Sequence, residues 1–434
     1  KLTISAVEEA ASSQEDADLI AKVVASASDD LVNKVVEEVS KNSTEENQTL
    51  SAHVLKAIVD SDSGKIDIIN NDVKDIMIKQ TIQSAQNQAG GTGVQQTQDM
   101  TSIVSDIIVN SNTETGSKMI EELNNSSTDT ENDLSLQVIS AISEKDTTKL
   151  NTLSENNKEQ IDTLTQSAVK NAGSSQESAD LIAKVVANAS DDFANQIIGE
   201  VTKNSTDENQ ALSAKVMKSI VETNPDKIEN LNDENKDNLI SQTIEAAKNQ
   251  AEGTSSDELD LSNTIAEIVT NSDTGTAAKV LESLEEATTD SDSKLSLSVV
   301  SNLTKQENYE EKMEILSVTS SVVDQSINKL IEKAVENASS EEDLELVTDI
   351  VENSKGTIGD KIVNSANKNE ESKKKITEVI VKVVEKNPEK AVQIIEKNKN
   401  TNTVLKTIKS KIENGEAVSA EDFEEVFDKN VSPN

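Results

Sequence analysis

Two short runs of aspartate and serine are the residues of this 434-residue chain whose types could bind a metal ion. They are Asp60-Ser61-Asp62-Ser63-Gly64 and Asp290-Ser291-Asp292-Ser293. A complete twelve-residue calcium loop has glycine at its sixth position and glutamate at its twelfth. Gly64 comes one position early, and the second run has no glycine. The calcium candidates are therefore Asp60, Asp62, Asp290 and Asp292. Ordinary turn chemistry, which needs no bound metal, explains both runs better.

Catalytic residue types are scarce. The chain has no cysteine and one histidine, His53, for which we expect a solvent-facing position in the middle of a helix. Paired carboxylates such as Glu37-Glu38 and Glu121-Glu122 recur, but acid–base catalysis needs two carboxyls in different environments within one cleft. We also find no glycine-rich phosphate loop and no nucleophile motif. The sequence therefore predicts a protein that is not an enzyme and has no cofactor.

The charge balance restricts the partners. Aspartate and glutamate number 81 against 41 lysines, with no arginine, so the formal net charge is −40. Such a field repels nucleic acids and anionic membranes, and it attracts basic proteins and diffusely bound divalent cations. No apolar run approaches the ~20 residues of a membrane span, so we expect no membrane insertion.

The carboxyl-terminal part departs from this acidic character. Lysine outnumbers acid between Lys368 and Lys411, with Lys373, Lys374 and Lys375 in a row. Without arginine or aromatic residues, this segment suits an acidic protein surface better than a nucleic acid. Further on, Phe423 and Phe427 lie one helical turn apart in an acidic tail. They either cap the end of the fold or anchor it in a groove of another subunit.

These segments belong to a repetitive helical chain. Residues 17–42, ADLIAKVVASASDDLVNKVVEEVSKN, return as ADLIAKVVANASDDFANQIIGEVTKN at 179–204, which is 162 residues later. Apolar residues at i, i+1, i+4 and i+5 indicate one-sided helices, and the Ser/Ala/Asp gap between them indicates a tight turn. A single helical hairpin of this kind buries its apolar face only when neighbours stack on it.

Each long repeat divides into two units of about 80 residues. In the first unit we expect five helices, over residues 17–27, 29–42, 45–60, 65–70 and 73–88. The chain then divides into an amino-terminal partial repeat (1–16), five repeats (17–100, 101–178, 179–262, 263–343 and the lysine-richer 344–415) and an acidic tail helix (416–434). Because Leu2-Thr3-Ile4-Ser5-Ala6-Val7 matches residues 164–169, the chain begins part-way through its own repeat.

Stacked short helices with apolar pairs at helical spacing resemble α-solenoids of the armadillo and HEAT type. The resemblance covers nearly the whole chain at the level of architecture, and no specific motif matches. It implies an all-α, elongated solenoid with an extended surface for protein partners.

Two functions fit these observations. The first is a structural protein of the cell surface or extracellular space that assembles head to tail into filaments through its termini. The repeats, the acidic body, the lysine-rich fifth repeat and the two tail phenylalanines suggest it. The second is a monomeric scaffold that binds a basic peptide or protein along its concave face.

Overall fold

The computed structural model of the protein describes residues 7, 14–43, 49–89, 99–126, 134–171, 175–204, 211–251, 260–287, 293–319, 321–338, 340–354, 362, 370–397 and 410–418. The tail phenylalanines Phe423 and Phe427 and the candidates Asp290 and Asp292 lie outside these residues.

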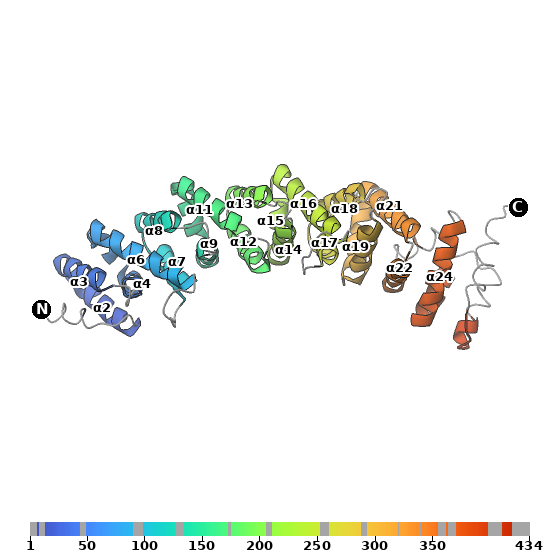
Figure 1. The fold of residues 1–434 in the computed structure, drawn as a ribbon, viewed down its shortest axis with the longest axis horizontal. Helices are drawn as coiled ribbons and strands as arrows, with labels where there is room; N and C mark the ends of the chain where they lie inside the picture. The colour runs from blue at the N-terminus through green and yellow to red at the C-terminus, as the bar shows by residue number, and fades with distance from the viewer. Residues whose placement is uncertain are drawn as a thin grey trace. The chain divides into compact units, whose positions relative to one another are not determined.

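All regular secondary structure in the described residues is helical, and the chain forms two compact units, Lys1–Asn235 and Lys236–Asn434 (Figure 1). The first unit contains α2 (Gln14–Ser26), α3 (Asp29–Asn42), α4 (Leu50–Asp62), α5 (Lys65–Ile68), α6 (Asn71–Ala89), α7 (Met100–Asn110), α8 (Thr113–Ser126), α9 (Leu134–Lys145), α10 (Thr147–Asn156), α11 (Lys158–Asn171), α12 (Gln176–Asn188), α13 (Asp191–Asn204), α14 (Ala211–Thr223), α15 (Asp226–Glu229) and the first turn of α16 (Asp233–Ala251). The second contains the rest of α16 and α17 (Leu261–Asn271), α18 (Thr274–Ala287), α19 (Ser293–Lys305), α20 (Tyr309–Thr319), α21 (Ser321–Asn337), α22 (Glu341–Asn353), α24 (Glu370–Lys386) and α25 (Pro388–Lys397).

The helices of each unit pack in two layers. In the first unit, α2, α4, α7, α9, α12 and α14 each contact the next and form one layer, while α3, α6, α8, α11 and α13 form the other. In the second unit, α17, α19, α22 and α24 form the first layer, and α18 and α21 lie in the second. Packing of each helix pair mainly on its neighbours confirms the α-solenoid architecture that the sequence predicts.

The helix boundaries follow from the sequence signals. The side chains of Asp99, Asp146, Ser175, Asp260 and Ser340 accept hydrogen bonds from backbone N–H groups in the first turns of α7, α10, α12, α17 and α22. The five helices expected in residues 17–88 are present, with ends within three residues of those predicted, except that α4 begins at Leu50 rather than at 45.

The core consists of valine, isoleucine, leucine and alanine, as the composition requires. It also holds polar residues that the sequence placed at the surface. His53 is only 5% exposed, so the expected solvent-facing position is wrong. Its helix, α4, is packed by α2, α7 and α6, and every residue from Leu50 to Leu55 is buried. Periodicity identifies one buried face of a helix, but a helix enclosed on several sides also buries its polar positions.

One type of hydrogen bond recurs five times along the described helices. A lysine in or beside a short helix donates a hydrogen bond from Nζ to the backbone carbonyl that ends an earlier helix of the first layer. Lys65 bonds Ala27 O (3.1 Å), Lys149 bonds Ser111 O (2.6 Å), Lys227 bonds Ala189 O (2.6 Å), Lys312 bonds Ser272 O and Lys390 bonds Ser354 O. We call these five lysines the lysine clasp.

The clasp satisfies a helix end electrostatically. Carbonyls of the last turn have no partner within their helix and carry the negative end of the helix dipole, so a cation there is favourable. The lysines are partly buried against these carbonyls. Burial lowers the pKa of the Lys149 and Lys312 ammonium groups, and the charges of Asp146 and Asp273 offset this only in part. Each clasp lysine thereby ties a short helix to the turn between the two layers.

Replacing Lys149 by methionine keeps the aliphatic stem and removes the donor to Ser111 O. We expect Lys149→Met to lower the free energy of unfolding of its unit by about 1–2 kcal/mol, the usual value of a charged hydrogen bond at a helix end. Thermal and urea unfolding would measure it. Lys158→Met, at an exposed first position of α11, is the matched control and should change little. Equal effects of the two substitutions would contradict a special role for the clasp.

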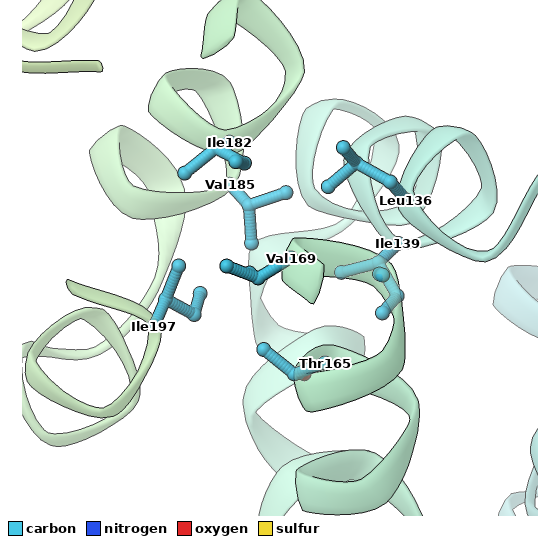
Figure 2. Close-up of a pocket in the computed structure, with 8 residues that line it drawn as sticks. Leu136, Ile139, Thr165, Val169, Ile182, Val185 and Ile197 are labelled. Carbon is cyan, nitrogen blue, oxygen red and sulfur yellow. The ribbon is translucent and has the colours of Figure 1, made fainter. Parts of the chain in front are cut away.

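The first unit contains a small apolar cavity between α9, α11, α12 and α13 (Figure 2). Its lining residues are Leu136, Ile139, Thr165, Ala168, Val169, Ile182, Val185 and Ile197. Thr165 is the one lining residue with a side-chain hydroxyl, and its buried Oγ1 has no hydrogen-bond partner among the described residues. The corresponding position holds Ile82 in α6 and Ile244 in α16, both buried. A shorter, polar side chain in α11 thus explains the empty space.

Filling this cavity should stabilise the first unit. We expect Thr165→Ile to raise the free energy of unfolding by about 1–2 kcal/mol, because it removes an unpartnered hydroxyl and buries further carbon. Thr165→Val should show how much of this gain in the free energy of unfolding comes from removing the hydroxyl alone. The reverse change, Ile244→Thr, should destabilise the chain. A lower melting temperature for Thr165→Ile would show that the cavity walls cannot accept the added carbon.

Candidate functional site

The helices of the second layer in the first unit begin at a common edge. Polar contacts join the first two turns of neighbouring helices. Asn33 of α3 bonds Ile68 O just before α6 (3.0 Å), Lys118 of α8 pairs with Asp75 of α6 (2.8 Å), and Gln196 of α13 bonds Asp162 of α11 (2.7 Å). Because these helices run in the same direction, their positive dipole ends lie side by side.

This edge is rich in carboxylates. The start of α16 lies beside α13, because Asn235 Nδ2 donates to Asn195 O (2.7 Å). The first turns of the second-layer helices and of α16 carry exposed acids, which we call the acidic edge: Asp29, Asp30, Asp72, Glu114, Glu159, Asp191, Asp192, Asp233 and Glu234. Four lysines lie with them, Lys65, Lys149, Lys158 and Lys227, and three of these belong to the clasp and donate to carbonyls. Acids near helix N-termini are stabilised by the dipole. The edge keeps a clear excess of negative charge at the surface.

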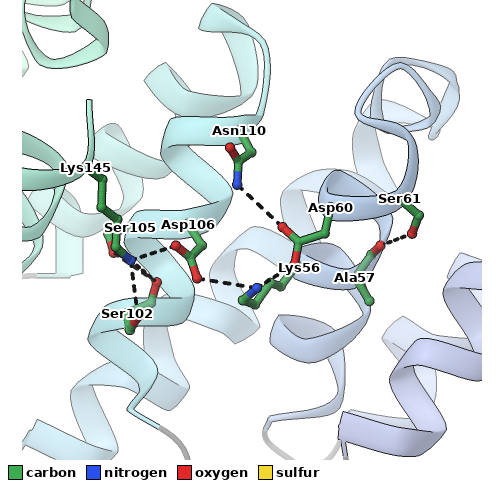
Figure 3. Close-up of polar contacts among 9 residues, drawn as sticks. All are labelled: Lys56, Ala57, Asp60, Ser61, Ser102, Ser105, Asp106, Asn110 and Lys145. Atoms are coloured by element: carbon green, nitrogen blue, oxygen red, sulfur yellow. Dashed lines mark hydrogen bonds and ion pairs between the residues drawn. The ribbon is translucent and has the colours of Figure 1, made fainter. Parts of the chain in front are cut away.

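The first layer carries a different polar surface, shown in part in Figure 3. Asp106 of α7 pairs with Lys145 of α9 at 2.6 Å and with Lys56 of α4 at 3.4 Å. Lys145 also donates to Ser105 Oγ (2.9 Å), and Lys56 pairs with Asp60. Burial would lower the pKa of Lys56, but its bonds to Asp60 and Asp106 outweigh this and raise it. A similar link joins Glu144 of α9 to Lys184 of α12 (3.0 Å).

These links form a ladder of opposite charges across the first-layer helices. The residues joined by these links are Asp60, Asp106 and Glu144 with Lys56, Lys145 and Lys184, and Lys218 pairs with Glu222 within α14 (3.7 Å). The two charges nearly cancel. The ladder fixes neighbouring helices against one another, whereas the charge that could attract a basic partner is concentrated on the acidic edge.

The calcium candidates Asp60 and Asp62 make hydrogen bonds and ion pairs within the protein. Asp60 is engaged with Lys56 (2.5 Å) and with Asn110 (3.4 Å). Asp62 Oδ1 accepts a hydrogen bond from the backbone N–H of Gly64 (3.1 Å), which is ordinary turn chemistry. Among the described residues, no group of three or more His, Cys, Asp or Glu side chains could hold a metal ion.

The lysine run lies in the amino-terminal half of α24. Lys374 is exposed, and Lys375 pairs with Glu371 (3.1 Å) and donates to Glu336 O (2.7 Å). The backbone of Lys373 is helical, and its side chain lies outside the described atoms. None of the described helices is long and apolar enough to cross a lipid bilayer.

Sequence reasoning missed both the clasp and the acidic edge, although each leaves a signal. The clasp lysines recur at corresponding positions of the repeats. The acids of the edge follow the turns between helices, where we expected only capping residues. The shared direction of the helices, which brings the acids together, depends on the tertiary packing.

Removing the central member of the ladder should loosen α4, α7 and α9. We expect Asp106→Ala to lower the free energy of unfolding by about 1 kcal/mol, because it leaves the partly buried Lys56 and Lys145 with fewer partners. High salt should reduce this loss. Chemical unfolding would measure both, with Glu155→Ala at an exposed position of α10 as control. A loss for Asp106→Ala no larger than the control's would show that the ladder is energetically neutral.

No protein-family model matches the sequence, and a comparison with curated proteins gives no match. Among solved structures, the chain is similar to an engineered protein, with 13% identity, 98% of each chain covered and a TM-score of 0.29. It is also similar to Kap121p in a complex with RanGTP, with 11% identity and a TM-score of 0.32. That match covers 94% of this chain and 51% of the Kap121p chain. The α-solenoid assignment rests on the two-layer packing and not on these likenesses.

Proposed function

We propose that this protein is a non-enzymatic α-solenoid scaffold that binds a basic protein segment along the acidic edge. The observation that carries the proposal is the alignment of nine exposed carboxylates at the starts of parallel neighbouring helices. An extended lysine-rich segment running across these helices would meet one or two new carboxylates at each one. Solenoids commonly use such extended surfaces for protein partners.

The charge distribution favours this edge over the face of the first layer. The sequence suggested binding along the concave face of the array, but the ladder on the first layer pairs its charges internally. A partner there would have to break Asp106–Lys145 and similar links before it gained new ones. On the acidic edge, Asp191 pairs with Lys227 (3.0 Å), and three of the four lysines at this edge donate to backbone carbonyls.

The repeat length belongs to the same proposal. Successive clasp lysines are 84, 78, 85 and 78 residues apart in the sequence. This spacing supports a structural unit of about 80 residues with five helices, and boundaries at 17–100, 101–178, 179–262, 263–343 and 344–415. A scaffold built in this way would present the same acidic features at regular intervals.

A second function is end-to-end assembly into a filament or surface layer, at the cell surface or outside the cell. The lysine excess between Lys368 and Lys411 and the acidic character of the rest of the sequence support it, because segments of opposite charge in one chain favour heterologous contacts. Surface labelling of intact source cells would test the location.

Binding of a lysine-rich peptide tests the scaffold. We expect the quadruple variant Asp29→Asn, Asp30→Asn, Asp191→Asn and Asp192→Asn to bind the peptide about tenfold more weakly, with a smaller dependence on salt. The matched control removes four carboxylates from helices of the first layer: Asp18→Asn, Asp60→Asn, Glu144→Gln and Glu222→Gln. Titration calorimetry at two salt concentrations would compare them. Equal weakening by both variants would show diffuse attraction instead of a site on the acidic edge.

A further inference from the structure

The dipeptide Asn-Gly occurs once in the sequence, at residues 414 and 415. Both residues are exposed, and they follow the helical residues 410–413. The pair is chemically distinctive because the backbone nitrogen after an asparagine can attack the carbon of the side-chain amide and close a five-membered succinimide ring. Glycine permits this attack best, since it has no Cβ beside the attacking nitrogen and its backbone adopts the widest range of conformations.

The turn at these residues is a Schellman motif. Gly415 has a φ of 69°, in the left-handed region, and nothing lies within 4 Å of the position that a Cβ would take. The N–H of Gly415 donates to Ile412 O (3.0 Å), and the N–H of Glu416 donates to Lys411 O (2.8 Å), as this motif requires. Asn414 is therefore an exposed asparagine, and a hydrogen bond to the preceding turn holds the nitrogen that follows it.

Other asparagines that end helices are followed by a more firmly held backbone. The serines after them are at most 6% exposed, and their N–H groups donate to the last turns of α7, α17 and α22. The carbonyls of the same serines accept the clasp lysines. Attack by one of these nitrogens would require the helix end and the clasp to open together. The three pairs are Asn110-Ser111, Asn271-Ser272 and Asn353-Ser354.

The turn at Gly415 has neither restraint. None of the five clasp lysines of the described residues donates to it, and residues 413–417 are all exposed. Exposed helix ends open with free energies near zero, whereas packed elements open with free energies up to that of global unfolding. The nitrogen of Gly415 therefore leaves its hydrogen bond far more often than the nitrogen of a clasped serine does.

We infer that Asn414 is a site of spontaneous deamidation, with Gly415 supplying the attacking nitrogen and water as the co-reactant. Hydroxide removes the N–H proton of Gly415, and the nitrogen bonds to Cγ of Asn414. The bond between Cγ and Nδ2 breaks, and Nδ2 takes a proton from solvent and leaves as ammonia. Water then opens the succinimide at either carbonyl and gives aspartate or isoaspartate, so no atom is oxidised or reduced.

Both products change the end of the helix. Each places a carboxylate at the carboxyl end of a helix, where the dipole is negative and a cation is favoured. Isoaspartate also routes the main chain through the side-chain carbons of residue 414, which lengthens it and displaces the N–H of Glu416 from Lys411 O. Deamidation thus converts a closed helix end into an open one, beside the segment between Lys368 and Lys411 in which lysine outnumbers acid.

Peptide mapping of the full chain after prolonged incubation tests the inference. Cleavage after lysine releases residues 412–429, in which Asn414 is the one asparagine, and residues 334–355, which contain Asn353. We expect Asn414 in the folded chain to be converted about tenfold faster than Asn353, because the nitrogen after Asn353 is buried and clasped. Conversion should be faster at mildly alkaline than at neutral pH, since the attacking nitrogen must lose its proton. Two products of equal mass and different chromatographic retention would identify the succinimide route.

Two controls separate chemistry from structure. Asn414→Gln keeps the amide but cannot close a five-membered ring, so residues 412–429 of this variant should stay unmodified while its circular dichroism and melting match wild type. Incubation in urea removes the structural protection. It should accelerate conversion of Asn353 about tenfold or more and that of Asn414 by less than about threefold, because the turn at Gly415 already opens in the folded chain.

Three results would overturn the inference. An Asn414 that stays intact in the folded chain but is converted in urea would show that the Schellman turn protects it. Equal conversion of Asn353 and Asn414 in the folded chain would show that burial and the clasp make no difference. Conversion of residues 412–429 that persists in the Asn414→Gln variant would show that the change does not pass through a succinimide at this residue.

Discussion

The lysine clasp is the interaction on which the arrangement of the layers depends. The end of a first-layer helix exposes carbonyls that nothing in its own helix can satisfy. A lysine in or beside a short helix that comes later in the sequence donates a hydrogen bond to that carbonyl. The described residues contain five such bonds. The contact joins segments 36 to 40 residues apart in the sequence, so it fixes how each helix pair sits on the next. These bonds form in a partly buried environment, and this burial lowers the pKa of the Lys149 and Lys312 ammonium groups.

The placement of the negative charge follows from the same geometry. The turn that receives the clasp lysine also starts a second-layer helix, and the positive end of that helix favours carboxylates. Because neighbouring second-layer helices start at one edge, their acids gather there, although each acid is locally explained as a helix-end residue. In the first layer the acids are instead paired with lysines of neighbouring helices, as Asp106 is with Lys56 and Lys145. One surface is therefore balanced and structural, and the other keeps the charge that long-range attraction needs.

Helix type and order could be predicted from the sequence, because apolar spacing and small polar gaps are local properties. The expected helix over residues 29–42 has those ends in the structure, and Pro388 begins α25 as a proline at a first turn should. Burial on several sides could not be predicted, and His53 is the example. The cavity beside Thr165 and the acidic edge also depend on neighbours that come from distant segments. Phe423 and Phe427 lie outside the described residues, so their role stays a prediction.

The octapeptide ADLIAKVV shows how far burial in a repeat array depends on the neighbouring helices. It occurs at residues 17–24 in α2 and at residues 179–186 in α12. Val185 of α12 lies against residues of α9 and α11 and is 1% exposed, whereas the corresponding Val23 of α2 is 36% exposed. An identical local sequence thus forms the same helix in both places, and the helices that pack on it determine how much of its apolar face is buried.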